Sequence, residues 1–174
     1  MTDPRPGRGH DAGLPAGWAL IPEPSLLAPS AIRLSPTAQA VAFAYTPAAM
    51  FSPVLAVAPG LQAEFEAGHR AYRQAVQHHI AEFVRTVRGC GGDPLVYVVA
   101  LELAPFLAWC ARTGHDPDQP GPRGVYAAVR AAAAPAPDVI VWPPRRGDPC
   151  WCSSAHAYGQ CCAHPAVAAS VGLN

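Results

Sequence analysis

The 174-residue sequence lacks an excess of charge of either sign. It carries 12 basic side chains against 12 acidic ones, and only 14% of its residues are charged. Balanced charges create no strong overall field, so the composition gives no reason for attraction to nucleic acid or to an acidic membrane surface. Nucleic acid therefore stays a disfavoured alternative as a partner.

The chain also lacks a long apolar run. None of its segments approaches the roughly 20 apolar residues that cross a bilayer as a helix. Its opening, Met-Thr-Asp-Pro-Arg-Pro-Gly-Arg-Gly-His, contains no apolar core of a secretory signal. We therefore expect a cytoplasmic protein without membrane association. Thiols stay reduced in that compartment, which favours metal binding over disulfides where cysteines cluster.

Familiar catalytic motifs are missing as well, including a nucleophile elbow, a P-loop and a dinucleotide fingerprint. His69 falls on the apolar stripe of a predicted helix, where a hydrogen-bonded core histidine is the usual outcome. His78 and Glu82 are one turn apart on its flank and polar face, which is typical of a solvated pair. Cys90 follows the helix end and could be a reactive thiol, whereas Cys110 lies in an apolar run. We predict no catalytic residue and lean against an enzyme.

What the sequence does contain is a cluster of cysteines near its C-terminal end, namely Cys150, Cys152, Cys161 and Cys162. Four thiols fill a tetrahedral shell, and the segment is too short to build a core of its own. We predict one Zn²⁺ per chain, bound in a structural site because no coordination position stays open. A redox pair and an iron–sulfur site are the alternatives.

Residues beside the cysteines suggest how such a centre is completed. Four thiolates around Zn²⁺ leave a formal charge of about −2, which Arg145 and Arg146 are placed to offset. Tyr158 is expected to pack over the centre as a small apolar lid. His156 and His164 are spare imidazoles, and either could replace a thiolate as ligand, although an exposed histidine is the more ordinary outcome.

The cysteine spacing resembles the SEC-C motif, a small zinc-binding tail found on the SecA translocation ATPase and on many otherwise unrelated bacterial proteins. The resemblance covers about residues 145 to 163 and is carried by Arg146, Asp148, Pro149, Cys150, Cys152, Ser154, Tyr158, Cys161 and Cys162. It implies zinc binding and docking to another protein, since the SecA tail contacts chaperone and ribosome. Other members carry the motif as an accessory to catalytic domains.

Several positions depart from the family pattern. Ser153 and Ala155 stand where glycines are usual, and His156, Ala157, Gly159 and Gln160 stand where lysine and arginine normally cluster. The metal ligands are kept, but the basic character is lost. The easiest argument for contacts to phosphate or RNA disappears with it.

The first half of the chain predicts two strands and one long helix. Residues 41–45 alternate large side chains with alanine, and the apolar run 54–57 between prolines is a second, shorter candidate strand. From Leu61 the apolar residues recur three, four or seven apart until Val87, which predicts a helix ending at Gly89.

The second half predicts a central strand over 95–101, because this segment is apolar on both faces, although a buried helix running on to Thr113 is the alternative. Pro105 suits the first turn of a helix that stops at Gly114. A third helix is expected around 124–134 and a last short strand over 139–142.

These elements predict an α+β class fold, a small layered domain with a few strands and about three helices, plus a C-terminal zinc knuckle. We expect a disordered arm over 1–20, an α+β domain over 21–142 and a zinc-binding tail over 143–174, with Pro143 and Pro144 as a stiff spacer.

Three functions are open on this evidence. The first is a protein-interaction adaptor, and the others are a nucleic-acid or ribosome-associated binder and an enzyme with an accessory SEC-C tail. Trp151 lies between two ligands, so we expect its ring to stay at least partly exposed and to act as a binding anchor. The alternative is that it packs onto the body and fixes the tail.

Overall fold

The computed structural model describes residues 40–61, 66–119 and 121–164. The arm expected over 1–20 and the last part of the expected tail, 165–174, lie outside the described residues. Within the described part the chain forms an α+β domain, as predicted, with three strands and four α-helices.

The strands form one mixed sheet. β1 (Ala40–Tyr45), β2 (Leu95–Ala100) and β3 (Val139–Trp142) lie in the order β1-β2-β3. β1 runs parallel to β2, with Val41 opposite Val96, and β3 runs antiparallel to β2, with Ile140 opposite Val98. The predicted central strand is therefore confirmed: β2 lies between the other two strands, which explains why its sequence is apolar on both faces.

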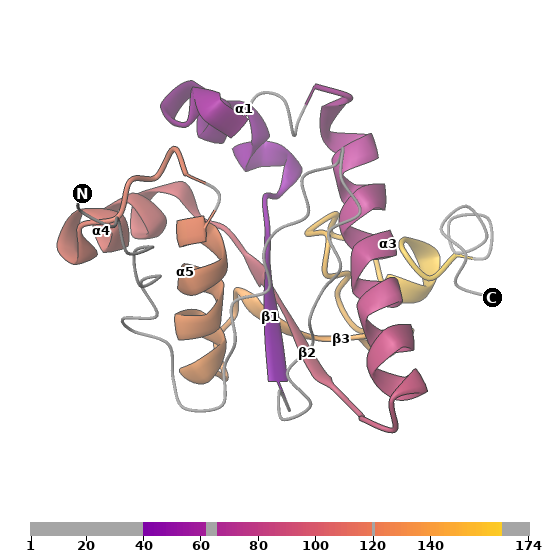
Figure 1. Ribbon diagram of the computed structural model, residues 1–174. Helices are drawn as coiled ribbons and strands as arrows, with labels where there is room; N and C mark the ends of the chain where they lie inside the picture. Colours follow the sequence, from indigo (N-terminus) through magenta and orange to yellow (C-terminus); the bar gives the residue numbers. More distant parts are fainter. Residues whose placement is uncertain (1–39, 62–65, 120, 165–174) are drawn as a thin grey trace, which may run out of the picture.

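Helices cover both faces of this sheet (Figure 1). α3 (Gly68–Gly89) lies on one face and α5 (Gly121–Ala132) on the other, while α1 (Ala48–Val57) and α4 (Leu103–Thr113) pack beyond the strand ends. Two short 3₁₀ turns complete the fold, η1 (Pro59–Leu61) and η2 (Tyr158–Gln160).

The alternation in β1 decides what each face receives. Tyr45 and Val41 point into the cluster shared with α3, where Ile80 is fully buried. The alanines on the opposite face of β1 meet the small side chains Ala127 and Ala131 of α5, so this helix approaches the sheet closely. Because large side chains of β1 face α3 and its alanines face α5, the two helix layers pack at different distances from the sheet.

The predicted strand over 54–57 is wrong. These residues form the second half of α1, which contains Pro53 in its interior. The side chain of Val54 is buried in a cluster with Leu101 and Phe106. Contacts with α4 thus stabilise a helix in a segment where the flanking prolines suggested a strand, a case of tertiary packing overriding a local pattern.

The other predicted helices are confirmed with shifted ends. α3 begins at Gly68, later than expected, because Leu61 belongs to η1, and it ends at Gly89 as expected. α4 stops at Gly114, whose φ of 72° is left-handed and suits glycine. α5 begins at Gly121 rather than 124. Among the described residues, no helix has the length and apolarity needed to cross a membrane.

Enlarging the alanine at the α5–sheet contact should destabilise the fold. Ala127 is 0% exposed, so Ala127→Leu should lower the free energy of unfolding by about 1–3 kcal/mol through overpacking. Ala132→Leu adds the same side chain at an exposed position of the same helix and should change it by less than about 0.5 kcal/mol. Urea unfolding of both variants measures the difference, and equal values would contradict the close approach of α5.

Candidate metal centre

The first cysteine pair sits in a tight, hydrogen-bonded turn. Pro149 and Ala157 form an isolated antiparallel bridge, and the Cys150 N–H donates to the His156 carbonyl at 3.0 Å. Between Pro149 and Ala157, the residues Ser153 and Ala155 have positive φ values of 58° and 62°. These are the positions where the SEC-C pattern has glycine, and the left-handed backbone supplies the physical reason for that preference.

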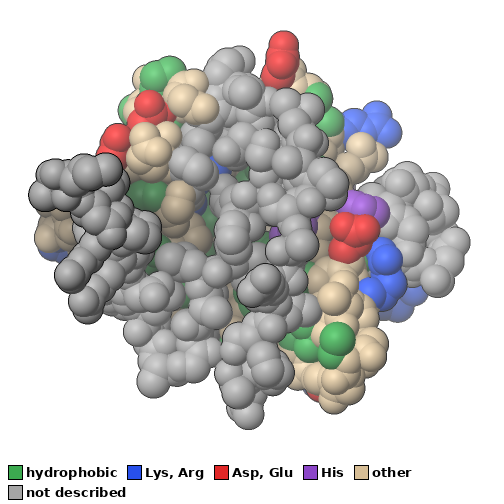
Figure 2. Space-filling view, in the orientation of Figure 1, with side chains coloured by type: hydrophobic (Ala, Val, Ile, Leu, Met, Phe, Trp, Pro, Cys, Tyr) green, Lys and Arg blue, Asp and Glu red, His purple; other side chains and the backbone are tan. Residues whose placement is uncertain are grey.

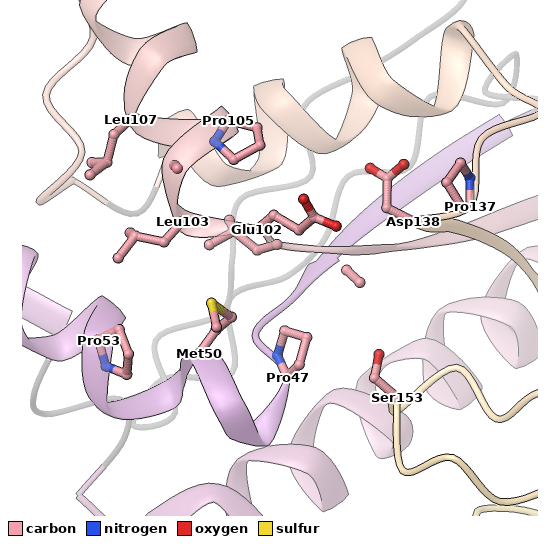
Figure 3. Close-up of a pocket in the computed structure, with 13 residues that line it drawn as sticks. Pro47, Met50, Pro53, Glu102, Leu103, Pro105, Leu107, Pro137, Asp138 and Ser153 are labelled. Carbon is pink, nitrogen blue, oxygen red and sulfur yellow. The ribbon is translucent and has the colours of Figure 1, made fainter.

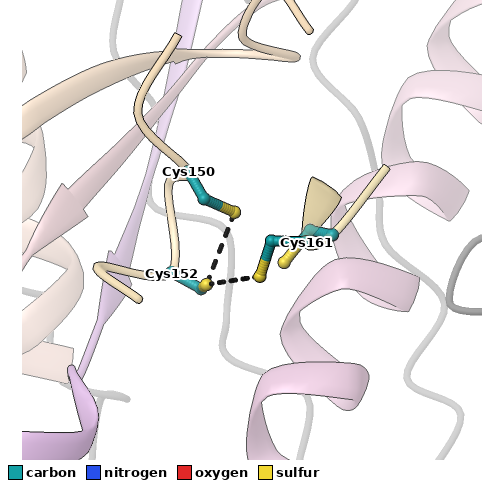
Figure 4. Close-up of side chains that lie close together, drawn as sticks. Cys150, Cys152 and Cys161 are labelled. Atoms are coloured by element: carbon teal, nitrogen blue, oxygen red, sulfur yellow. Dashed lines mark hydrogen bonds between the residues drawn. The ribbon is translucent and has the colours of Figure 1, made fainter. Parts of the chain in front are cut away.

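The second pair follows η2. The Ala163 N–H donates to the Tyr158 carbonyl at 2.9 Å and the His164 N–H donates to the Cys161 carbonyl at 3.1 Å, so the chain turns back at the adjacent cysteines. This turn lies against the first pair, and the sulfurs of both arms converge on one point (Figure 4).

The four sulfurs are close enough to share one metal ion. All four Sγ atoms lie within 4.8 Å of one another. Cys150 and Cys152 are 3.4 Å apart and Cys152 and Cys161 are 3.5 Å apart. Zinc bound by four sulfurs at about 2.3 Å places them about 3.8 Å from each other, a separation that lies between these two distances and the 4.8 Å limit of the set. None of these cysteines forms a disulfide.

The electrostatics of the cluster call for a cation. Hydrogen bonding with Cys152 raises the pKa of Cys150 to about 11, and the same interaction holds the pKa of Cys152 well below its usual range. Hydrogen bonds from Cys150 and Cys152, together with burial, raise the pKa of Cys162. Buried neighbouring thiols therefore oppose one another's ionisation, and a divalent cation bound between them would favour the thiolate form.

Neither histidine near the cysteines joins this group. The set of side chains that could hold one ion contains the four cysteines alone among the described residues. His156 and His164 are exposed. The structure therefore gives no support for the imidazole alternative that the sequence left open.

The cysteine segment is part of the main hydrophobic core. Cys150, Cys152 and Cys162 are each at most 3% exposed, and they share one cluster with Val41 of β1 and Phe83 of α3. Tyr158 is buried in the same cluster, in agreement with its expected role as a lid.

The expected exposure of Trp151 is wrong. Its side chain is 1% exposed and meets the ring of Tyr45 edge-on, with centroids 5.0 Å apart and planes at 78°. The turn directs the two flanking sulfurs toward the other two cysteines, and the indole between them packs in the cluster formed by β1 and α3. Trp151 is a core residue that fixes the segment to the body.

Two residues of α3, which the sequence analysis did not identify, contact the cysteine cluster. The Gln77 side chain donates from Nε2 to the Cys162 carbonyl at 3.0 Å. The Arg73 guanidinium donates from Nη1 to the Cys161 sulfur at 3.8 Å. The two lie one helical turn apart, and a polar pair on the buried side of an amphipathic helix is the signal that could have revealed them.

The arginines expected to offset the charge are placed differently. Arg145 and Arg146 are exposed, and Arg146 packs over Gly159, where a Cβ would lie 3.0 Å from the Arg146 carbonyl oxygen. Neither side chain donates to a cysteine sulfur in the described part of the chain. Ser154 Oγ does so, to Cys161 at 3.2 Å.

The remaining candidate residues do not gather into an active site. His69 Nε2 lies 3.0 Å from the Tyr45 hydroxyl and 3.3 Å from the Thr46 carbonyl oxygen, and burial lowers its pKa. His78 and Glu82 form an exposed pair at 3.3 Å. Cys90 is exposed after the end of α3. Because His69 and Cys90 stand at opposite ends of one helix, about 30 Å apart, no pocket unites them.

A cavity of about 780 Å³ opens at the carboxyl ends of β1 and β2 (Figure 3). Its walls are largely apolar, and its charged or hydroxyl-bearing lining residues are Glu102, Asp138 and Ser153. Arg130 engages the Asp138 carboxylate through Nε at 2.8 Å and Nη2 at 2.5 Å, which lowers the pKa of Asp138. With that carboxylate paired and no histidine or cysteine among the described lining residues, the cavity presents no acid–base pair.

Comparisons with family models, curated proteins and solved structures found no match. The geometry of the four cysteines therefore carries the interpretation of the centre.

Removing the Trp151 side chain should lower the stability of the domain. Trp151→Ala deletes a core side chain, so the free energy of unfolding should fall by about 3–5 kcal/mol. His156→Ala, in the same segment but exposed, should change it by less than about 0.5 kcal/mol. Chemical denaturation of the metal-loaded proteins makes the comparison. A stability loss below about 1 kcal/mol for Trp151→Ala would restore the reading of Trp151 as a surface anchor.

Proposed function

We propose that Cys150, Cys152, Cys161 and Cys162 bind one structural zinc ion in a SEC-C-like centre, and that the domain stabilised in this way acts by binding another protein. The observation that carries the first part is the convergence of four sulfurs within 4.8 Å. Soft thiolate donors in a tetrahedral arrangement select zinc among the common divalent ions.

The donor set also argues for a structural rather than a catalytic ion. Four protein ligands leave no position for water or substrate. Iron–sulfur clusters are less suitable, because two adjacent ligands such as Cys161 and Cys162 do not match the spacings those clusters use. When bound, zinc supplies a cross-link between the two arms of the segment, and this chain's own residues pack that cross-link into the core.

Metal analysis tests the zinc assignment. The purified protein should contain about one zinc per chain, and the double variant Cys161→Ser and Cys162→Ser should contain none. Because the cysteines share a cluster with Val41 and Phe83, loss of zinc should lower the melting temperature of the whole domain rather than unfold the segment alone.

The matched control is Cys90→Ser, which removes an exposed thiol and should leave both zinc content and melting temperature unchanged. Full zinc retention in the double variant would eliminate the proposed centre.

A protein-interaction role is supported by an exposed apolar patch. Leu95 is 43% exposed and Val141 is 50% exposed. Tyr97, on the same face of β2 as Leu95, is paired with Val141 in register. This patch, the Leu95–Tyr97–Val141 surface, lies on the face of the sheet that α5 covers only in part. Exposed apolar side chains that adjoin one another are typical of protein contacts.

The charge distribution gives no matching support for nucleic acid. On the face shown in Figure 2, acidic, basic and histidine side chains of the described residues adjoin one another, and no single sign dominates. Two of the arginines are paired with aspartates, Arg88 with Asp93 and Arg130 with Asp138. A nucleic-acid surface instead gathers unpaired basic side chains.

Capture from cytosol with immobilised zinc-loaded protein tests the interaction role. The double variant Leu95→Ser and Val141→Ser should lose more than about tenfold in the amount of specifically retained protein, since burial of each large apolar side chain contributes about 1.5–3 kcal/mol. Val57→Ser, at an equally exposed valine of α1, is the control and should retain the partner. If the double variant retains the partner protein as well as the wild type does, this surface is not the binding site. If the immobilised protein instead captures nucleic acid and added salt releases it, the partner is a nucleic acid and not a protein.

A further inference from the structure

We infer that Arg73 and Gln77, one turn apart on α3, are positioning residues of the cysteine centre. Arg73 balances the charge of the thiolates and Gln77 holds the backbone that carries the second cysteine pair. This inference rests on the proposed zinc site and adds to it residues that lie more than 80 positions away along the chain.

Charge is the first argument. A divalent ion with four thiolates leaves a net charge of about −2, and three of the four cysteines are buried. A buried excess charge needs a nearby counter-charge. In the described part of the chain, Arg73 is the arginine whose guanidinium reaches a cysteine sulfur, at 3.8 Å from Cys161.

The environment of Gln77 is the second argument. Its side chain is 0% exposed, on a helix whose other buried residues are all apolar, Ile80 and Phe83 among them. Nε2 donates to the Cys162 carbonyl at 3.0 Å, while Oε1 has no hydrogen-bond partner among the residues that the structure describes. Burying an amide with only part of its hydrogen bonds made is unfavourable, so its presence indicates a requirement beyond packing. The requirement that the geometry shows is fixing the Cys161–Cys162 turn.

The two residues act from one rigid element. Residues four apart on a helix lie on the same face, and the segment with Cys161 and Cys162 lies beside α3 (Figure 1). Arg73 therefore meets the sulfur side of the turn and Gln77 meets its backbone. Groups that hold the ligands of a metal in this way typically change its affinity by 10–100-fold when removed.

The test compares Arg73→Gln with Arg70→Gln in the full-length protein. Both substitutions remove one positive charge from α3, but Arg70 is exposed one turn earlier, and among the described residues the hydrogen bond to a cysteine sulfur comes from Arg73. Zinc affinity, measured by competition with a chromophoric chelator, should fall about 10–100-fold for Arg73→Gln and less than about threefold for Arg70→Gln. Arg73→Lys, which restores the charge, should recover at least part of the loss.

Thiolate reactivity separates charge compensation from a purely structural effect. In a zinc-bound cysteine the metal already keeps the sulfur ionised, and a charged hydrogen-bond donor then withdraws electron density from it. Zinc-bound Cys161 should therefore be alkylated faster by iodoacetamide in Arg73→Gln than in Arg70→Gln. Gln77→Leu keeps the packing volume and should shrink the difference in melting temperature between zinc-loaded and zinc-free protein.

The outcomes are distinct. If wild-type protein holds zinc but Arg73→Gln and Arg70→Gln have equal zinc affinity and equal alkylation rates, the role of Arg73 is overturned while the centre stands. An unchanged difference in melting temperature for Gln77→Leu overturns the role of Gln77. Absence of zinc from wild-type protein overturns the proposed centre itself.

Discussion

The packing of Trp151 against Tyr45 decides where the cysteines lie. Tyr45 ends β1 and also stacks on Tyr72 of α3, with centroids 5.7 Å apart. One contact therefore joins the cysteine turn to the sheet and to the longest helix. Two aromatic side chains bury enough apolar surface to fix such a segment, and the cysteine cluster is part of the core.

That location imposes an electrostatic condition on the rest of the structure. Sulfurs in bulk water can ionise without neighbours, but four of them in a core cannot all do so unless positive charge is supplied. A divalent cation held by the four sulfurs would supply most of this positive charge. The helix that packs against the turn supplies further compensation through Arg73, and Gln77 satisfies the Cys162 carbonyl. α3 thus provides both the apolar side chains that pack against the cysteine segment and the hydrogen bonds that its polar atoms accept.

Local patterns predicted the features that depend on neighbouring residues. The alternation in 41–45, the apolar strand at 95–101 and the glycine stop of α4 each reflect a period or a turn that a short window contains. The four cysteines were likewise evident from spacing. What local patterns could not reveal depends on distant contacts: α1 is helical because of α4, Trp151 is buried because of Tyr45, and Arg73 meets a sulfur 88 positions away.

The departures from the SEC-C pattern can be understood in the same terms. Ser153 and Ala155 keep the left-handed backbone that glycine usually provides, although a side chain makes this conformation less favourable by roughly 1 kcal/mol or more per residue. The turn is therefore held by its surroundings, namely the bridge between Pro149 and Ala157 and the anchoring of Trp151. Since Ser153 also lines the cavity at the ends of β1 and β2, one peptide bond connects the wall of that cavity to Cys152 of the cysteine cluster. The conformation of the turn, the shape of the cavity and the position of Cys152 are consequently determined together.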